Sequence, residues 1–121
     1  MELDSIQSEA NYNQFLSGII KTEKVWGLKH PEEGFAFCES NEFEDAYVVV
    51  FWSDEASAEH HAEGEWSEYQ VEAIEFGTFL EKWLKNLHEE ELLVGPNWDE
   101  NLCGLEVEPL DILQTLLEQL D

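Results

Sequence analysis

Hydrophobic positions repeat with a helical period near the start of the chain and alternate soon afterwards. Residues 24–29 predict a strand, and residues 34–39 alternate as its hairpin partner would. Pro31 and Gly34 predict the turn between them. The earlier repeat has the spacing of one helix face and predicts an amphipathic helix built on Tyr12, Phe15, Leu16, Ile19 and Ile20.

The next apolar run, AYVVVFW at residues 46–52, is hydrophobic on both faces. Such a run is typical of a central strand that is covered on two sides. A helix over residues 54–63 should follow it, because Ser53 or Asp54 can cap its first turn. Its inward face should be small, consisting of Ala56, Ala58 and Ala62.

The second half of the chain alternates between strand and helix signals. Residues 69–76 predict a short strand, and Thr78 with Glu81 forms a capping box that should open a helix reaching about residue 88. The apolar side of this helix should consist of Phe79, Leu80, Trp83, Leu84 and Leu87.

Two further short strands are expected at residues 92–94 and 105–107, the first ended by Gly95 and Pro96. Pro109 suits the first position of a last helix. We expect the apolar face of that helix to carry Leu110, Leu113, Leu117 and Leu120.

Together these elements predict a single α+β domain over residues 1–121, with residues 1–8 as a segment that can be disordered. The fold should be a mixed, mostly antiparallel sheet of about five to six strands, flanked by about four helices. The early strands suggest an antiparallel meander, and the later helical crossovers suggest strands added in parallel.

The charge of the chain excludes several classes of partner. There are 29 acidic residues against five lysines and no arginine, and the formal net charge is −24. Binding to nucleic-acid phosphates or to an anionic membrane surface needs clustered basic residues, so we expect neither partner. Without arginine there is also no bidentate clamp for a phosphate or a carboxylate.

The two cysteines, Cys38 and Cys103, lie far apart and form no CxxC pair, so their spacing predicts no disulfide. The start of the chain lacks the basic and apolar regions of a signal peptide. The longest apolar run, at residues 46–52, is too short to cross a bilayer. We therefore expect a cytoplasmic protein with two reduced thiols.

Several of these residues resemble a known family. They are Val25-Trp26-Gly27-Leu28-Lys29 with Gly34-Phe35-Ala36, the apolar strand ending in Trp52, then Trp66, Ile74, Phe79-Leu80, Trp83-Leu84 and Leu87, and a Val-centred strand followed by Pro. Over about residues 12–120 the chain resembles the bacterial family catalogued as domain of unknown function 2750. The resemblance implies a small, standalone bacterial protein of mixed α and β structure, and it implies no reaction. The Gly95-Pro96-Asn97-Trp98 segment departs from the family pattern.

The candidates for metal binding and catalysis are weak. His60 and His61 could pair with nearby glutamates at a zinc ion, but adjacent helical residues point about 100° apart and no HExxH spacing exists. Cys38 or Cys103 could act as a nucleophile if a histidine approached, yet nothing resembles a nucleophile elbow, and an acidic field raises a thiol pKa. We assign no catalytic residue, no metal ligand and no cofactor.

Two tryptophans are candidates for contact with a partner. Trp66 and Trp98 lie in predicted loops with acidic neighbours, which are Glu65, Glu68, Asp99 and Glu100. An aromatic anchor within an acidic rim suits a basic partner. Each of the two indoles could equally close the edge of the core.

The leading hypothesis is a non-catalytic protein that binds a basic protein, as an immunity protein or an inhibitor would. The alternative is that the acidity is an adaptation to salt or for solubility; in that case the melting temperature should rise with NaCl concentration. A small enzyme is the third possibility, and it would need a pocket containing His30, His88 or Cys38.

Overall fold

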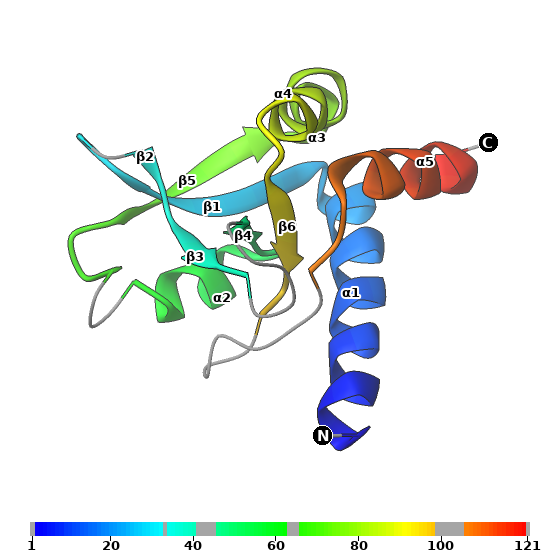
Figure 1. Cartoon of the computed structure of the whole chain (residues 1–121), viewed down its shortest axis with the longest axis horizontal. Helices are drawn as coiled ribbons and strands as arrows, with labels where there is room; N and C mark the ends of the chain where they lie inside the picture. Colours follow the sequence, from blue (N-terminus) through cyan, green and yellow to red (C-terminus); the bar gives the residue numbers. More distant parts are fainter. Residues whose placement is uncertain (1, 33, 41–45, 63–65, 99–105, 121) are drawn as a thin grey trace.

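The computed structural model describes residues 2–32, 34–40, 46–62, 66–98 and 106–120 (Figure 1). The chain forms an α+β fold, as predicted. Its elements are α1 (Glu2–Thr22), β1 (Lys24–His30), β2 (Gly34–Phe35), β3 (Phe37–Glu39), β4 (Tyr47–Phe51), α2 (Glu55–His60), β5 (Gln70–Glu75), α3 (Phe76–Thr78), the π-helical turn η2 (Phe79–Trp83), α4 (Leu84–Glu89), β6 (Leu93–Pro96) and α5 (Pro109–Leu120).

The strands of the described residues form two three-stranded sheets rather than one. The first has the order β2-β1-β5 and is antiparallel, and the second has the order β3-β4-β6, in which β4 and β6 are parallel. Trp26 and Trp52 join the two sheets through reciprocal backbone hydrogen bonds of 2.9 and 2.8 Å. The expectation of parallel additions after the helices is therefore correct for β6 and wrong for β5.

The central strand β4 divides the interior into two cores. Val49 and Phe51 belong to the core beneath α1, α4 and α5, whereas Val48, Val50 and Trp52 belong to the core beneath α2. Successive side chains of a strand point to opposite faces, so a strand covered on both sides must be apolar throughout. The prediction of a central strand at this place is confirmed.

The predicted strand over residues 34–39 divides at Ala36. β2 pairs with β1, whereas β3 pairs with β4, so the chain passes from one sheet to the other within this segment. The alternation of Phe35 and Phe37 is unaffected by the change of partner, which explains why the pattern predicts one continuous strand.

The predicted capping box does not form. The helix begins at Phe76, and Thr78 has helical dihedrals with no side-chain cap hydrogen bond. From Phe76 to Glu89 the helix is continuous, with the π turn η2 in its middle.

The structure agrees with the other helix predictions only in part. α1 begins at Glu2, so it starts well before Tyr12, the first residue of the predicted helix face. In α2, Asp54 is the cap, and Ala58 is buried but Ala56 is exposed. In α5 the fully buried residues among those whose burial is described are Ile112 and Leu116, and not the predicted Leu110, Leu113 and Leu117.

The returning strand predicted at residues 105–107 is reduced to a bridge between Val107 and Val94, with residue 105 outside the described residues. Within the described ranges, no helix has both the length and the hydrophobicity that crossing a membrane requires.

Candidate functional site

The structure buries both candidate tryptophans. Trp98 is 2% exposed and Trp66 is 9% exposed, and both belong to the core beneath α2. The Trp98 carbonyl accepts a hydrogen bond from Trp52 Nε1 at 3.1 Å, and the indole of Trp98 covers Gly95. This arrangement agrees with the alternative that each indole closes the edge of the core.

The acidic residues predicted to surround these tryptophans are only partly described. Glu68 is exposed, whereas Glu65, Asp99 and Glu100 lie outside the described residues. Contact between this region and a partner stays a prediction, and in the present conformation the two indoles offer little surface for it.

The rings of the adjacent histidines meet edge-to-face with centroids 6.0 Å apart, and their other surroundings differ. The His61 ring stacks on Trp52 with centroids 4.6 Å apart, and its Nδ1 lies 2.8 Å from the Ser57 carbonyl oxygen. His60 is exposed at the end of α2. Where the chain is described, no three His, Cys, Asp or Glu residues come together as metal ligands.

Of the residues considered for a small enzyme, the described ones, His30, His88 and Cys38, do not line the aromatic groove formed by Phe35, Phe37, Tyr47 and Trp83. Cys38 lies in β3 against the core beneath α2, and Cys103 is outside the described residues. The His30 ring contacts the Tyr69 ring with centroids 5.2 Å apart and planes inclined by 59°, and His88 is exposed near the end of α4.

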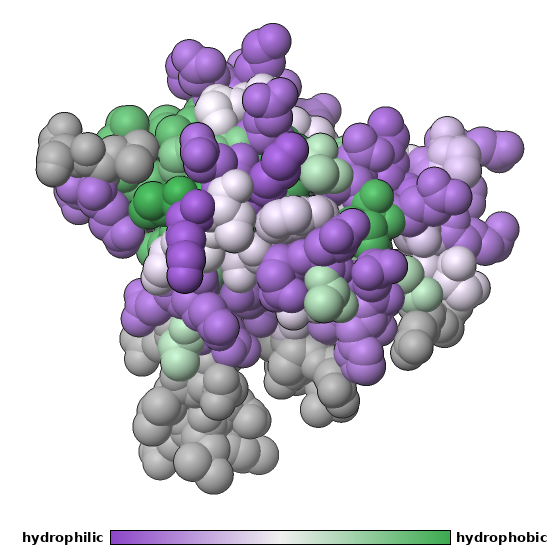
Figure 2. All heavy atoms as spheres, turned by 180° about the vertical axis from the view of Figure 1, so that it is seen from behind, coloured by the Kyte–Doolittle hydropathy of each residue, from purple (hydrophilic) through white to green (hydrophobic). Residues whose placement is uncertain are grey.

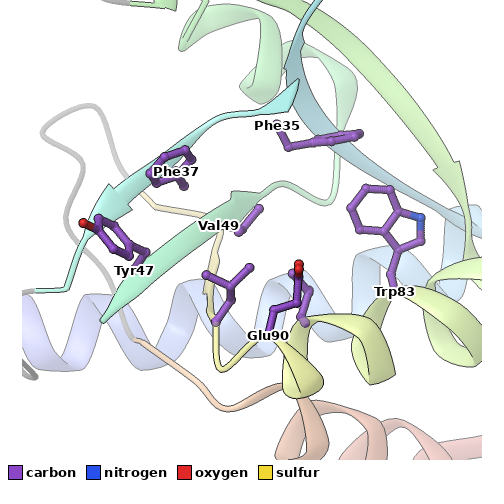
Figure 3. A pocket seen from close by; sticks show the side chains of 8 residues that line it. Phe35, Phe37, Tyr47, Val49, Trp83 and Glu90 are labelled. Carbon is purple, nitrogen blue, oxygen red and sulfur yellow. The ribbon is translucent and has the colours of Figure 1, made fainter. Parts of the chain in front are cut away.

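An open groove of about 600 Å³ lies on the face of the β3-β4-β6 sheet that is opposite the core beneath α2 (Figure 3). All but one of its described lining residues are aromatic or aliphatic; the lining set is Phe35, Phe37, Tyr47, Val49, Trp83, Leu87, Glu90 and Leu92. The helix of η2 and α4 supplies Trp83 and Leu87 to the lining, and the strands β3 and β4 supply Phe37, Tyr47 and Val49.

Two aromatic pairs form the walls of the groove. Phe37 and Tyr47 make an edge-to-face pair with centroids 5.4 Å apart on β3 and β4. Opposite them, Phe35 and Trp83 make a second edge-to-face pair at 4.7 Å. Val49 lies between the two pairs, as Figure 3 shows.

The Phe37–Tyr47 wall is exposed to solvent to an extent that is unusual for such large side chains. Phe37 is 51% exposed and Tyr47 is 41% exposed. Among the described residues the other large hydrophobic side chains with comparable exposure are Leu110 and Leu117 of α5. Seen from behind, the surface is mostly hydrophilic, with hydrophobic side chains gathered where α5 lies (Figure 2).

Glu90 is the single charged residue among the described lining residues of the groove. It follows the last residue of α4, and its side chain extends into the hollow in Figure 3. An apolar surface with one carboxylate can hold a group that has an apolar body and a positive charge.

Sequence reasoning assigned the aromatic and aliphatic residues of the groove to strands and to the buried side of a helix, and it gave no role to Glu90. The alternation of Phe35 and Phe37 does place them on one face of the chain, and this is the signal that was available. Whether a helix then covers that face depends on where the helix lies, which a local pattern does not encode.

Comparison with known proteins supports the resemblance seen in the sequence. A search of the curated proteins found no match. The family model described as "Protein of unknown function (DUF2750)" matches residues 12–116, which include both cores and every residue that lines the groove. The chain therefore belongs to the DUF2750 family.

Proposed function

We propose that this protein is a non-catalytic binding protein for a basic protein partner, and that the groove walled by Phe37, Tyr47, Phe35 and Trp83 is the apolar centre of the interface. The observation that carries the proposal is an exposed aromatic groove on a molecule with a formal net charge of −24.

The apolar part of the proposal rests on the exposed wall. A free protein gains nothing by leaving Phe37 half exposed beside a hollow, because burying a large side chain contributes about 1.5–3 kcal/mol. Interfaces are often anchored by aromatic side chains that enter such hollows near the centre of the contact.

The electrostatic part concerns the kind of partner. A field produced by 29 acidic residues attracts a basic protein over long distances and repels acidic ones, so it raises the association rate and selects by charge. An inhibitor or immunity protein that neutralises a basic toxin or nuclease would use both features.

The test begins with affinity capture at about 50 mM NaCl and then measures the purified candidate by calorimetry at two salt concentrations. We expect a basic protein whose affinity decreases as the salt concentration increases, because exposed charges are screened beyond about 10 Å at 0.1 M salt.

Matched variants then show whether the interface is specific. Phe37→Ala should weaken binding about tenfold, as loss of an aromatic anchor does. Leu117→Ala is the control, because Leu117 is 52% exposed against 51% for Phe37 but lies on α5. If both variants bind as the parent protein does, or if no basic protein is retained at low salt, the proposal is wrong.

A further inference from the structure

We infer that the groove receives a short segment of the basic partner in which a large apolar side chain stands next to a lysine or arginine. This inference rests on the proposed function and specifies what the groove recognises: the apolar side chain lies between the two aromatic walls, and the cationic group reaches Glu90.

The size and lining of the groove fit such a segment. Its volume of about 600 Å³ falls within the range of about 300–1,000 Å³ for sites that enclose a drug-sized ligand, so it has room for more than one side chain. The space between the Phe37–Tyr47 pair and the Phe35–Trp83 pair offers aromatic edges and faces to an apolar group.

The charges on this face select a cation. Glu90 lies in the groove, and no lysine is among the described residues that line it. The neighbouring residues Glu89 and Glu91 are exposed carboxylates that add to the local negative field. An apolar segment carrying an acidic residue would meet repulsion here, whereas a lysine or arginine would find a partner.

The aromatic wall already holds a lysine from the chain itself. Lys29 Nζ lies 5.8 Å from the centroid of the Phe35 ring, in a smaller hollow of about 260 Å³ next to the groove that Phe35 and Trp83 also line. A cation at this distance from an aromatic ring is attracted by the ring quadrupole. Lys29 lines that smaller hollow and is not among the described residues that line the groove, so we place the cationic group of the partner at Glu90 and not at the Phe35 ring.

The helix that supplies Trp83 has an unusual turn at this place. The Leu84 amide donates to the Phe79 carbonyl, five residues back, so that η2 contains one more residue than a regular turn. An extra residue rotates the side chains that follow by about 100° relative to a regular helix, and such π turns are frequent at functional sites. In this chain the turn ends at Trp83, in the wall of both hollows.

The first experiment tests the chemistry of the groove without a partner. Phenylbutylammonium, phenylbutanol and phenylbutyrate share one apolar body and differ in charge, and their binding can be followed by NMR titration of the isotope-labelled protein. We expect shifts at Phe37, Val49 and the Trp83 indole, with the ammonium bound about threefold more tightly than the alcohol and the carboxylate bound most weakly.

A pair of variants separates Glu90 from the general acidic field. Glu90→Gln should remove the preference for the ammonium over the alcohol. Glu89→Gln should retain that preference, because Glu89 is the adjacent residue with the same charge but is not among the described residues that line the groove. If the alcohol binds as well as the ammonium, or if both variants lose the preference equally, the inference is overturned.

The second experiment uses the partner identified by capture. Glu90→Gln and Phe37→Ala should each weaken its binding, and a peptide of the partner with adjacent apolar and basic residues should compete. If Glu90→Gln binds a basic partner as tightly as the parent protein while Phe37→Ala binds it more weakly, the inference fails while the proposed function stands. If no basic partner is found, the proposed function itself fails, and the inference fails with it because there is no partner protein to supply the segment.

Discussion

Replacing Gly95 by alanine should destabilise the fold, because the indole of Trp98 occupies the space that a side chain would need. A Cβ at position 95 would lie 2.6 Å from Trp98 Cε2 and 2.7 Å from Trp98 Nε1. Trp98 is 2% exposed, and its backbone carbonyl holds the Trp52 indole, so the ring cannot move aside into solvent. The strain must therefore be absorbed by the core.

Overfilling a packed core by a methyl group costs about 1–3 kcal/mol, which for a chain of this size corresponds to a melting temperature lower by about 5–15 °C. Urea denaturation followed by circular dichroism measures the change, with the slope against urea expected to stay the same. Gly77→Ala is the control: no atom lies within 4 Å of a Cβ there, and the residue is in a helix. That variant should gain about 0.4–1 kcal/mol.

A double-mutant cycle identifies the cause. In a Trp98→Leu background the indole is gone, so Gly95→Ala should cost much less than it does alone, with a coupling energy of about 0.5–3 kcal/mol. The reasoning is refuted if Gly95→Ala is as stable as the parent protein. It is also refuted if Gly95→Ala lowers the free energy of unfolding equally in the parent and in the Trp98→Leu background.

Three further predictions concern stability. Asn97→Ala should lower the free energy of unfolding by about 1–3 kcal/mol, because the Asn97 side chain accepts a hydrogen bond from the Ser53 amide at 2.8 Å and donates one to the Ser53 hydroxyl at 3.0 Å. Urea denaturation measures the change, and an unchanged midpoint would contradict this. Asp54→Ala should remove the cap of α2 at a cost of about 0.5–2 kcal/mol, visible as faster amide exchange in that helix, and unchanged exchange would argue against it. Burial raises the pKa of Tyr12 above 10.0, with the Thr115 hydrogen bond opposing the shift. The fold favours the neutral phenol, so the contribution of Tyr12 to the free energy of unfolding is complete below pH 10.0 and is lost as the pH rises through the raised pKa. Tyr12→Phe should therefore reduce the slope with which the free energy of unfolding falls at alkaline pH. Equal slopes for the variant and the parent protein would contradict this.

Local patterns were sufficient for the elements whose cause is local. The helix around Phe15 and Ile19 and the strand of residues 46–52 follow from periodicity, since a side chain's direction depends only on its place in a turn or a pleat. The positions of β1 and β5 were also predicted, although the direction of β5 in its sheet was not.

What the pattern could not supply was the environment of each face. Phe37 and Val49 occupy paired positions on neighbouring strands, yet Phe37 is 51% exposed and Val49 is 6% exposed. Likewise Trp98, in an acidic segment that suggested a surface, is 2% exposed because it covers a glycine of β6.

The sequence by itself determined the charge of the molecule, its α+β class, its central strand and its family resemblance, because each of these depends on composition or on neighbours along the chain. Only the tertiary structure decided that two sheets form instead of one, that Trp66 and Trp98 are buried, and that an aromatic groove stays open beside α4. The physical reason is that the burial of a surface depends on which distant segment packs against it. The sequence of a strand does not encode where that distant segment lies.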